Sequence, residues 1–428
     1  MTNPSSMKVA VIGSGISGMV AAHRLSEHHQ VTVFEAGGYV GGHTNTVHVE
    51  LDGEDQHIDT GFIVFNETNY PCFSALLDEL GVASQPTEMS LSVRDDRDGL
   101  EYNGSSLNQL FIQRRNLVRP GFHRMIREIL RFGREAPEML TDTTTSKTVQ
   151  QYVDDNGYSA AFVDQYLVPL GTALWSAPAA TFRAFPIRFV VRFLHNHYML
   201  RIKGRPTWRV IRGGSFRYIE KLTARYSGRI MLNTPVESIR RMDIGVCLRF
   251  KDRPNEWFDH VIVACHADQA LKLLSDPSDR ERELLASFPY QSNDAVLHTD
   301  TSVLPRHRKA WASWNAHVPT EDRDRVSVTY HMNTLQSLIS KHHFCVTLND
   351  DSGIDPAKVL RRIRYEHPVY TLKQETAQRR HYELVNTNRT SFCGAYWGYG
   401  FHEDGVRSAL AVCEALAAVP VAEELAHA

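Results

Sequence analysis

The sequence lacks the features that mark several common protein classes. Its six cysteines are scattered over 428 residues and include no Cys-x-x-Cys pair. This spacing argues against a zinc site or a disulfide framework, and it favours free thiols in a reducing compartment. No run of about 18 apolar residues is present, so we expect no transmembrane helix. A Gly-x-Ser-x-Gly motif, which would suggest a nucleophilic serine, is also missing.

A dominant charge of one sign is missing too. The chain has 47 Lys and Arg against 49 Asp and Glu, a net charge of −2, so no global field selects nucleic acid. The first residues, MTNPSS, read as a short polar tail without a signal-peptide pattern, and we expect a cytoplasmic protein. Repeats and low-complexity linkers are absent, and the length suggests two interleaved domains.

The most informative segment is KVAVIGSGISGMVAAHRLSEHHQVTVFEA, close to the N-terminus. Val9, Val11 and Ile12 predict a short buried strand. A helix over residues 19–25 and a second strand that ends at Glu35 are predicted to follow. The unit therefore has the strand–turn–helix–strand order of a dinucleotide-binding fold.

Three glycines in the turn of this unit have the spacing GxGxxG. Gly13 permits the tight turn, Gly15 lets the backbone approach a pyrophosphate, and Gly18 allows close packing of helix on strand. The helix N-terminus offers free N–H groups to the phosphates. Glu35, 17 residues after Gly18, is placed to accept hydrogen bonds from a ribose diol. The candidate cofactor contacts in this unit are Gly13, Gly15, Ser17, Gly18, Glu35 and Ala36.

A second glycine element, GGYVGGHTNT, follows Glu35 at once. Many FAD oxidoreductases carry Gly-Gly-Arg-Thr or Gly-Gly-Arg-Ser here, where a loop passes close to the pyrophosphate and the flavin. In this sequence Gly41 and Gly42 are followed by His43 in place of the arginine, and then by Thr44. We therefore expect FAD as the cofactor, with His43 as a donor to a phosphate or to the flavin.

With these motifs the sequence resembles the flavin amine oxidase and phytoene desaturase superfamily. More closely, it resembles a bacterial group of NAD/FAD-binding proteins that often accompany cyclopropane-fatty-acid-synthase-like lipid methyltransferases. The stretches that carry the resemblance are HIDTGFIVFNETNYPCFSALLDELGV (57–82), RPTWRVIRGGSFRYIEKL (205–222), FDHVIVACHADQAL (258–271), AWASWNAHV (310–318) and FCGAYWGYGFHEDGVRSAL (392–410). In flavoproteins linked to branched or furan-containing fatty acids, a relative dehydrogenates a methylated acyl chain.

The resemblance implies further FAD contacts and a non-covalent cofactor. The segment NTPVESI (233–239) is similar to a strand that holds adenine through its backbone, with Val236 at its centre, and Ala264 ends the strand that closes the nucleotide fold. Thr60, Gly61 and Phe62 are implied beside the flavin ring. Near the C-terminus the implied contacts are Tyr396, Glu403, Gly405 and Val406.

The stretch FCGAYWGYGFHEDG (392–405) is then interpreted as a flavin platform. A helix from about Gly405 onwards would point its N-terminus at the pyrimidine end of the flavin. Tyr396 stands where an acid usually binds the ribityl chain, with Asp404 and Glu403 as substitutes or as helix caps. Tyr396, Trp397 and Tyr399 would form a wall beside the ring.

No metal site is expected. His402, Glu403 and Asp404 are adjacent on one turn and cannot converge on one ion. The His-Asn-His run at 195–197 lies in an apolar stretch and lacks the rest of a nuclease motif. The chemistry is therefore assigned to the cofactor.

Two basic, amphipathic runs predict the surface that meets the substrate. One extends from Asp164 to Glu220 without an acid between them and contains nine Lys and Arg; the other is FIQRRNLVRPGFHRMIREILRFGR (111–134). Such surfaces suit an anionic membrane leaflet or lipid head groups. We expect peripheral contact with the inner face of the membrane, and a lipid methyltransferase is implied as a partner.

The predicted function is that of an FAD oxidoreductase that dehydrogenates an unsaturated or methyl-branched fatty acyl chain, with hydride transfer to flavin N5. The alternatives are the reverse reaction, an amine oxidase and a flavin-binding accessory subunit. Candidate groups for catalysis are Tyr70, Trp175, Trp208, Tyr399 and His402. The predicted fold is mixed α/β, a discontinuous Rossmann-like FAD domain of the glutathione-reductase type (1–95, 205–275 and 385–428) interleaved with a substrate domain of a sheet plus helices (96–204 and 276–384).

Overall fold

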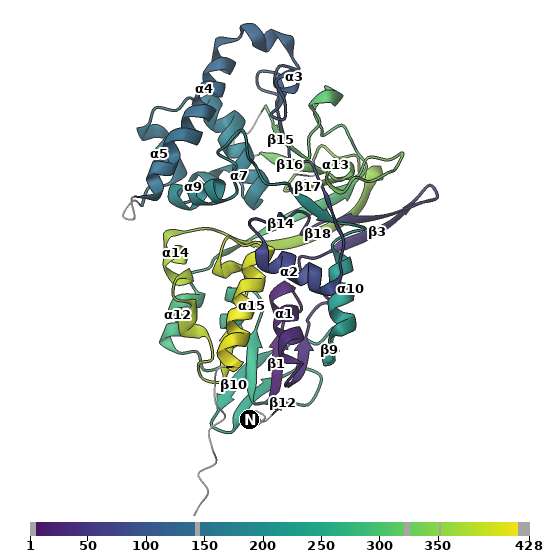
Figure 1. Ribbon diagram of the computed structural model, residues 1–428, viewed down its shortest axis with the longest axis vertical. Helices are drawn as coiled ribbons and strands as arrows, with labels where there is room; N and C mark the ends of the chain where they lie inside the picture. The colour runs from purple at the N-terminus through teal and green to yellow at the C-terminus, as the bar shows by residue number, and fades with distance from the viewer. Residues whose placement is uncertain (1–5, 142–145, 321–325, 351, 418–428) are drawn as a thin grey trace, which may run out of the picture.

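The computed structural model describes residues 6–141, 146–320, 326–350 and 352–417. A five-stranded sheet lies in the lower half of the molecule, and a larger sheet with a group of helices forms the upper half (Figure 1). The order of the smaller sheet is β19-β13-β1-β2-β9, and all its pairings are parallel. Its strands are β1 (Lys8–Ile12), β2 (Gln30–Phe34), β9 (Arg229–Met231), β13 (His260–Val263) and β19 (Thr390–Phe392). Three distant segments of the chain thus share one sheet, as a discontinuous nucleotide-binding domain requires.

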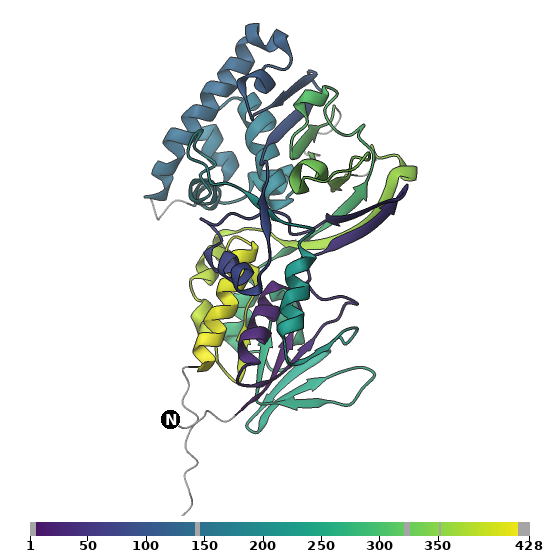
Figure 2. The ribbon, with the colours of Figure 1, turned by 45° about the vertical axis from the view of Figure 1, so that its right-hand side comes forward.

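Helices cover this parallel sheet. α1 joins β1 to β2, and α15 packs along α1 (Figure 2). The contact is close because Gly405 has no side chain: a Cβ there would lie 2.8 Å from Ile16 Cγ2. The helices of this half are α1 (Ile16–Leu25), α2 (Pro71–Leu80), α10 (Phe216–Arg225), α11 (Ala267–Leu273), α12 (Asp279–Leu285), α14 (Leu372–Gln378) and α15 (His402–Ala417).

The larger sheet has seven strands in the order β18-β14-β17-β16-β15-β6-β7. Its pairings are antiparallel except that of β15 with β6, which is parallel. The strands are β6 (Leu91–Asp95), β7 (Leu100–Asn103), β14 (Tyr290–His298), β15 (Trp314–Val318), β16 (Ser327–His331), β17 (Cys345–Leu348) and β18 (Val359–Pro368).

Three small sheets complete the strands. They are the hairpin β3 (Thr46–Leu51) and β4 (Glu54–Asp59), the pair β5 (Ser84–Pro86) and β8 (Arg209–Ile211), and the trio β10 (Ser238–Met242), β11 (Gly245–Arg249) and β12 (Glu256–Phe258). The β3–β4 hairpin projects at the side of the molecule, next to the larger sheet (Figure 1).

A helical lobe stands over the larger sheet. It contains α3 (Leu107–Leu110), η1 (Arg114–Val118), α4 (Pro120–Glu135), η2 (Ala136–Leu140), α5 (Val149–Asp155), α6 (Ala160–Phe162), the π-helical turn η3 (Val163–Leu167), α7 (Val168–Trp175), α8 (Ala179–Arg183) and α9 (Ile187–Asn196). Its core is aromatic, with Trp175 packed on Phe182, Phe185 and Phe193. The short helix α13 (Met332–Gln336) and the 3₁₀ turns η4 (Arg308–Ala310), η5 (Pro356–Lys358), η6 (His381–Leu384) and η7 (Ala395–Trp397) lie in the connections.

The mixed α/β fold class is confirmed, and the structure differs from the prediction in details. β6 pairs in the larger sheet although it falls within residues 1–95, so that sheet draws on residues from ahead of 96. α15 begins at His402, three residues before Gly405, which brings the acidic residues of this segment into its first turn. Val236 precedes β10 and is not part of a strand. None of the helices in the described part of the chain combines the length and apolarity that a bilayer span requires.

Candidate cofactor and substrate site

The GxGxxG turn forms a cradle of backbone at the carboxyl end of β1. Gly13 has φ +102°, and a Cβ at Gly18 would lie 2.0 Å from the Gly13 oxygen, so both positions need glycine. A Cβ at Gly15 would meet no protein atom within 4 Å. The space over Gly15, at the N-cap of α1, is therefore where a phosphate group can approach backbone N–H groups.

Glu35 stands at the end of β2, beside this cradle. Its carboxylate accepts hydrogen bonds from Ser14 N at 2.9 Å, Ser14 Oγ at 2.6 Å and Gly37 N at 2.7 Å. These bonds hold both carboxylate oxygens close to the turn. A carboxylate fixed here has the placement that a ribose diol requires.

The second glycine element lies directly on the first. Gly41 N donates to the Ser14 oxygen at 3.0 Å, and a Cβ at Gly42 would lie 3.2 Å from Gly15 Cα. The predicted contact residues on either side of Glu35 are thus brought together in space.

His43 extends from this element towards the larger sheet. Its ring stacks on that of Tyr365, with centroids 5.1 Å apart, and lies 5.3 Å from His367 and 5.9 Å from His266. Its Nε2 atom is buried and has no hydrogen-bond partner among the described residues. Burial, followed by the neighbouring histidines, holds the pKa of His43 well below its usual value, so the ring is neutral. A neutral ring with an unsatisfied nitrogen suits hydrogen bonding to a ligand.

The segment after β4 passes against the same element. Phe62 N donates to the His43 oxygen at 2.8 Å, and a Cβ at Gly61 would lie 2.2 Å from that oxygen. Thr60 is buried and its hydroxyl bonds both the Asn45 oxygen and the Tyr365 hydroxyl, each at 2.9 Å. The predicted group Thr60, Gly61 and Phe62 therefore adjoins His43 and Thr44.

His402, at the start of α15, joins the two ends of the chain. Its Nε2 atom bonds Thr44 Oγ1 at 3.0 Å and the Tyr218 hydroxyl at 2.9 Å, and its ring stacks on Phe62 at 3.6 Å. Burial lowers the pKa of His402 to about 3. Its Nε2 atom and one face of its ring are engaged by protein groups, so its predicted catalytic role stays a prediction. These contacts fix α15 against the glycine element.

The aromatic residues before α15 do not form one continuous wall. Tyr396 and Trp397 pack on Phe288, with centroids 4.9 and 5.0 Å away, whereas Tyr399 packs on Phe189 and Phe193 of the helical lobe, each at 5.5 Å. The Tyr396 hydroxyl and the Trp397 indole nitrogen are buried without a partner among the described residues. They add two polar atoms that a bound group could satisfy.

The two acids that follow His402 are held by backbone. Glu403 accepts from Cys72 N at 3.2 Å and Phe73 N at 2.9 Å, which caps the start of α2. Asp404 accepts from Tyr399 N and Phe401 N, both at 3.0 Å. Glu403 was predicted as a cofactor contact; both its carboxylate oxygens are engaged by α2, and the cofactor contact stays a prediction.

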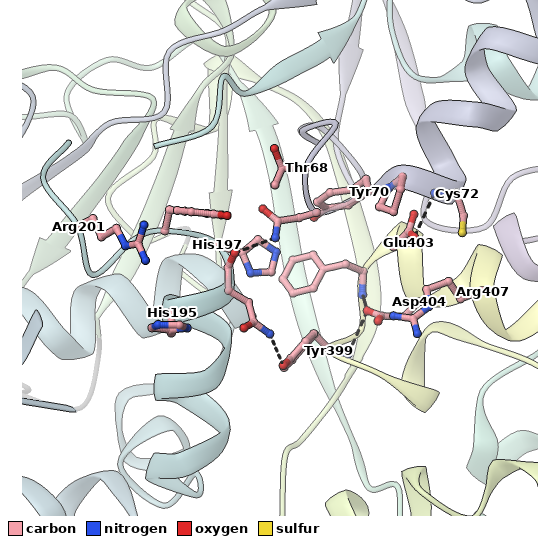
Figure 3. A pocket seen from close by; sticks show the side chains of 15 residues that line it. Thr68, Tyr70, Cys72, His195, His197, Arg201, Tyr399, Glu403, Asp404 and Arg407 are labelled. Atoms are coloured by element: carbon pink, nitrogen blue, oxygen red, sulfur yellow. Dashed lines mark hydrogen bonds between the residues drawn. The ribbon is translucent and has the colours of Figure 1, made fainter. Parts of the chain in front are cut away.

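A pocket of about 500 Å³ opens beside these acids, between α2, α9 and α15 (Figure 3). Its size is within the usual range for small-molecule sites. The lining residues are Thr68, Asn69, Tyr70, Pro71, Cys72, His195, Asn196, His197, Tyr198, Arg201, Tyr399, Phe401, Glu403, Asp404 and Arg407. The first turn of α15 therefore borders both sites: His402 contacts the second glycine element, and Glu403 and Asp404 line the pocket.

Two of the catalytic candidates line the pocket and three do not. Tyr70 and Tyr399 are lining residues; Asn196 Nδ2 donates to the Tyr399 hydroxyl at 3.1 Å, and burial raises the pKa of Tyr399 to about 12. Trp208 stacks on His197, with centroids 6.2 Å apart, behind the pocket. Trp175 lies in the core of the helical lobe.

The remaining predicted contacts have simpler surroundings. Ser17 and Val406 are buried, Ala264 packs next to the cradle, Ala36 is exposed, and Val236 packs at the edge of the core around β13. Sequence reasoning missed Tyr365, His266 and His367 around His43, and His197 and Arg407 at the pocket, whereas Arg201 lies in the basic run that was predicted to meet the substrate. The run at 195–197, set aside as a nuclease motif, was a signal for the pocket, because three polar residues lie at the C-terminal end of the mostly apolar α9 and all three line the pocket.

The residues present fit FAD. The open space over Gly15, the fixed carboxylate of Glu35 and the unsatisfied nitrogen of His43 are the groups that a dinucleotide with a flavin would engage. These three features follow one another from the end of β1 to the boundary between the two large sheets.

Comparisons with solved structures support the fold. Cyclohexylamine oxidase from Brevibacterium oxydans matches with TM-score 0.68 and 16% identity, over 96% of this chain and 100% of that chain. Putrescine oxidase bound to putrescine matches with TM-score 0.67 and 15% identity, over 97% and 99% of the two chains. A conjugated-linoleic-acid (CLA)-producing fatty acid isomerase from P. acnes matches with TM-score 0.65 and 14% identity, over 98% and 100%. No curated protein matches the sequence.

The sequence model described as flavin containing amine oxidoreductase matches residues 16–344. This region includes Gly18 of the first glycine element, the whole of the second glycine element, the segment at 60–62 and most of the larger sheet. The chain belongs to the flavin containing amine oxidoreductase family and is an FAD-dependent oxidoreductase.

Proposed function

We propose that this oxidoreductase acts on the acyl chain of an anionic lipid and dehydrogenates an unsaturated or methyl-branched chain. The observation that carries the proposal is the charge of the pocket beside α15. Arg201 and Arg407 line it and form no ion pair with a carboxylate among the described residues. Both carboxylate oxygens of Glu403 and the Oδ2 atom of Asp404 accept hydrogen bonds from backbone N–H groups.

This arrangement favours an anionic substrate over a cationic amine. Two guanidinium groups attract a carboxylate or a phosphate through charge-assisted hydrogen bonds and oppose an ammonium group. The apolar part of such a substrate would contact the rings of Phe401 and Tyr399. These rings continue into the aromatic core of the helical lobe, since Phe401 stacks on Phe193 with centroids 5.1 Å apart.

Asp404 is the group that we propose for proton exchange. It lines the pocket, and burial raises the pKa of its carboxyl to about 7. A carboxyl with a pKa close to the working pH can take up and release a proton. Bound FAD supplies the two-electron chemistry of acyl dehydrogenation, in which the substrate loses a hydride and a proton as a carbon–carbon double bond forms. Tyr70 and Tyr399 would orient the chain, because burial raises both their pKa values and keeps the hydroxyls protonated.

The test is an anaerobic absorbance titration of the FAD-loaded protein with mono-unsaturated and methyl-branched acyl phospholipids and fatty acids. Bleaching of the flavin band by lipid, but not by putrescine, is the expected result. Bleaching by the amine alone would replace this proposal with an amine oxidase. An oxidised flavin that ignores both would exclude the dehydrogenase. Reoxidation of the reduced protein by an unsaturated lipid would then identify the reverse reaction.

Two variants test whether the arginines of the pocket bind the head group of the lipid. Arg201→Gln and Arg407→Gln should each weaken binding of the anionic lipid by about tenfold or more, since a charge-assisted hydrogen bond contributes about 1.5–3 kcal/mol. The matched control is Arg212→Gln, at an exposed arginine away from the pocket. Equal affinity in all three variants would exclude the arginines as the site of the lipid head group.

A further inference from the structure

The β3–β4 hairpin carries a cluster of metal-ligating side chains that the cofactor chemistry does not use. His48, Asp55 and His57 place one ligand atom each within 4.8 Å of one another. The hairpin lies at the side of the molecule, apart from the pocket beside α15 (Figure 1).

Strand pairing explains why these side chains meet. The register pairs His48 with His57 and Glu50 with Asp55. Side chains two residues apart on a strand share a face, so the two pairs form a square on one face of the hairpin. The turn that fixes this register is Asp52-Gly53, with φ +48° and +79°, the conformation of a tight two-residue hairpin turn.

The contacts within the square bring nitrogen and oxygen atoms together. His48 Nε2 bonds Asp55 Oδ1 and lies 4.0 Å from Glu50 Oε1. The rings of His48 and His57 stack, with centroids 5.0 Å apart and an interplanar angle of 27°. Bonds of about 2.0–2.2 Å to one ion require ligand atoms within about 3.5 Å of one another, so side-chain rotations would close the present spread of up to 4.8 Å.

Contacts with the rest of the molecule also hold the hairpin on its other face, at its tip and at the His57 ring. Gln56 Nε2 donates to the Ile339 oxygen at 3.0 Å, and Lys341 Nζ donates to the Asp52 oxygen at 3.1 Å. The His57 ring stacks on Phe216 at 5.0 Å, and its carbonyl accepts from Gln336 Nε2 at 3.2 Å. Ligands that are oriented before binding lose little freedom when an ion arrives.

We propose that His48, Asp55 and His57 bind a divalent first-row transition metal such as Zn²⁺, with Glu50 as the fourth ligand. Two imidazoles with carboxylates suit Zn²⁺ and its neighbours, and they do not suit Mg²⁺ or Ca²⁺, which take oxygen ligands. The expectation of no metal site came from cysteine spacing and from residues 402–404. It overlooked this cluster because only the pairing of the two strands brings its members together.

The test is calorimetric titration of the full chain, free of any affinity tag, with Zn²⁺ at pH 7.5, and with Mg²⁺ as the comparison ion. One Zn²⁺ per chain should bind, and Mg²⁺ should not. His48→Ala and His57→Gln should each weaken Zn²⁺ binding by about tenfold or more, because loss of even an indirect partner of a metal ligand costs about 10–100-fold. Asp55→Asn, which keeps the side-chain shape, should also weaken binding.

The matched control is His28→Ala. It removes an exposed histidine of the sequence pair His28-His29 and leaves the hairpin intact. It should bind Zn²⁺ as the unchanged protein does. Thermal melting without metal checks that each variant is folded. Unchanged affinity in His48→Ala and Asp55→Asn, or no saturable Zn²⁺ binding at all, would overturn the proposal. Co²⁺ gives an independent readout, since its visible absorption band reports the number and type of ligands.

Discussion

Among single residues, the glycines of the first turn differ in what their missing side chains permit. Gly18 is required by the protein itself, because a Cβ there would overlap the backbone of Gly13. Gly15 is not crowded by any protein atom, and its φ of −64° suits any residue. The absence of a side chain at Gly15 therefore serves a ligand and not the fold.

The two positions give a paired prediction. Gly15→Ala should change the stability of the apoprotein by no more than about 1 kcal/mol, because alanine restricts the unfolded chain but is a poorer N-cap residue than glycine. The same change should weaken FAD binding by about tenfold or more, as measured by quenching of flavin fluorescence. Gly18→Ala should destabilise the apoprotein by at least about 2 kcal/mol, because the helix must move away from the strand. Tight FAD binding by Gly15→Ala would contradict the cradle.

Asp404 makes the stability of the protein depend on pH. Its carboxyl pKa is about 7 in the folded state and 3.8 ordinarily, so the folded state binds the proton more tightly. Stability from this group is complete below pH 4 and is lost as the pH rises towards 7. Asp59, with its pKa raised to about 6 by burial, acts in the same direction.

Asp404→Asn should remove this loss, since the amide oxygen can accept the same two backbone hydrogen bonds. We expect the variant to be more stable than the unchanged protein by about 1–3 kcal/mol at pH 8; this range allows for screening by solvent in the pocket. At pH 4 we expect the two proteins to be equally stable. Urea unfolding at pH 4, 6 and 8 measures the difference. Parallel pH profiles for the two proteins would show that Asp404 does not titrate in this range. The same variant should lower turnover of an acyl substrate if Asp404 exchanges the proton.

At the scale of elements, the first turn of α15 connects three parts of the molecule. His402 binds the glycine element, Glu403 caps α2, and Asp404 holds the loop that carries Tyr399. Successive residues of a helix point in directions about 100° apart, so one turn can serve three neighbours. The position of the pocket relative to the cofactor elements depends on this turn.

Glu403→Ala should cost about 1–3 kcal/mol of stability, because it leaves two backbone N–H groups of α2 without their acceptor. Glu403→Gln should cost less, since one amide oxygen can still accept. Denaturant unfolding measures both values. The control is Glu414→Ala, at an exposed position of the same helix, where we expect a change within about 0.5 kcal/mol. A similar loss in the control would mean that helix propensity, and not capping, is responsible.

For the whole molecule, the positive charge of the basic segment between Asp164 and Glu220 is partly neutralised by ion pairs with acids. Arg183 pairs with Asp164 at 2.6 Å, and Arg192 and Arg188 pair with Glu375 at 2.7 and 3.7 Å. This segment therefore presents less free positive charge than its sequence suggests. A second surface, around α3 and η1, combines arginines with exposed apolar side chains. Leu107, Leu117 and Val118 are 76%, 52% and 83% exposed there.

Contact with an anionic membrane stays a proposal, and this surface is where it can be tested. The protein should co-sediment with anionic vesicles and not with neutral ones at low salt. Val118→Asp should reduce the bound fraction several-fold, because a carboxylate replaces an inserting side chain next to Arg114 and Arg115. Ile339→Asp, at a residue 94% exposed elsewhere on the molecule, is the control. Equal binding to neutral vesicles, or equal loss in the control, would exclude this surface. A lipid methyltransferase partner also stays a prediction.

The sequence by itself determined the nucleotide-binding unit. The reason is that all its signals are local: β1, the glycines, α1, β2 and Glu35 lie within 28 residues. Strand and helix periods, the turn glycines and the acid at the strand end each act over a few positions. The second glycine element and the fold class followed from the same short-range patterns.

Only the tertiary structure decided which side chains meet. The spacing of residues in the sequence could not show which catalytic candidates line the pocket. Tyr70 and Tyr399 do, whereas His402 points towards Thr44, which is 358 positions away in the sequence. The neutralisation of the basic segment and the square of ligands on the β3–β4 hairpin likewise depend on pairings between segments. Contacts of this kind are set by how the packed elements are arranged, and the residues on either side carry no sign of their partners in the sequence.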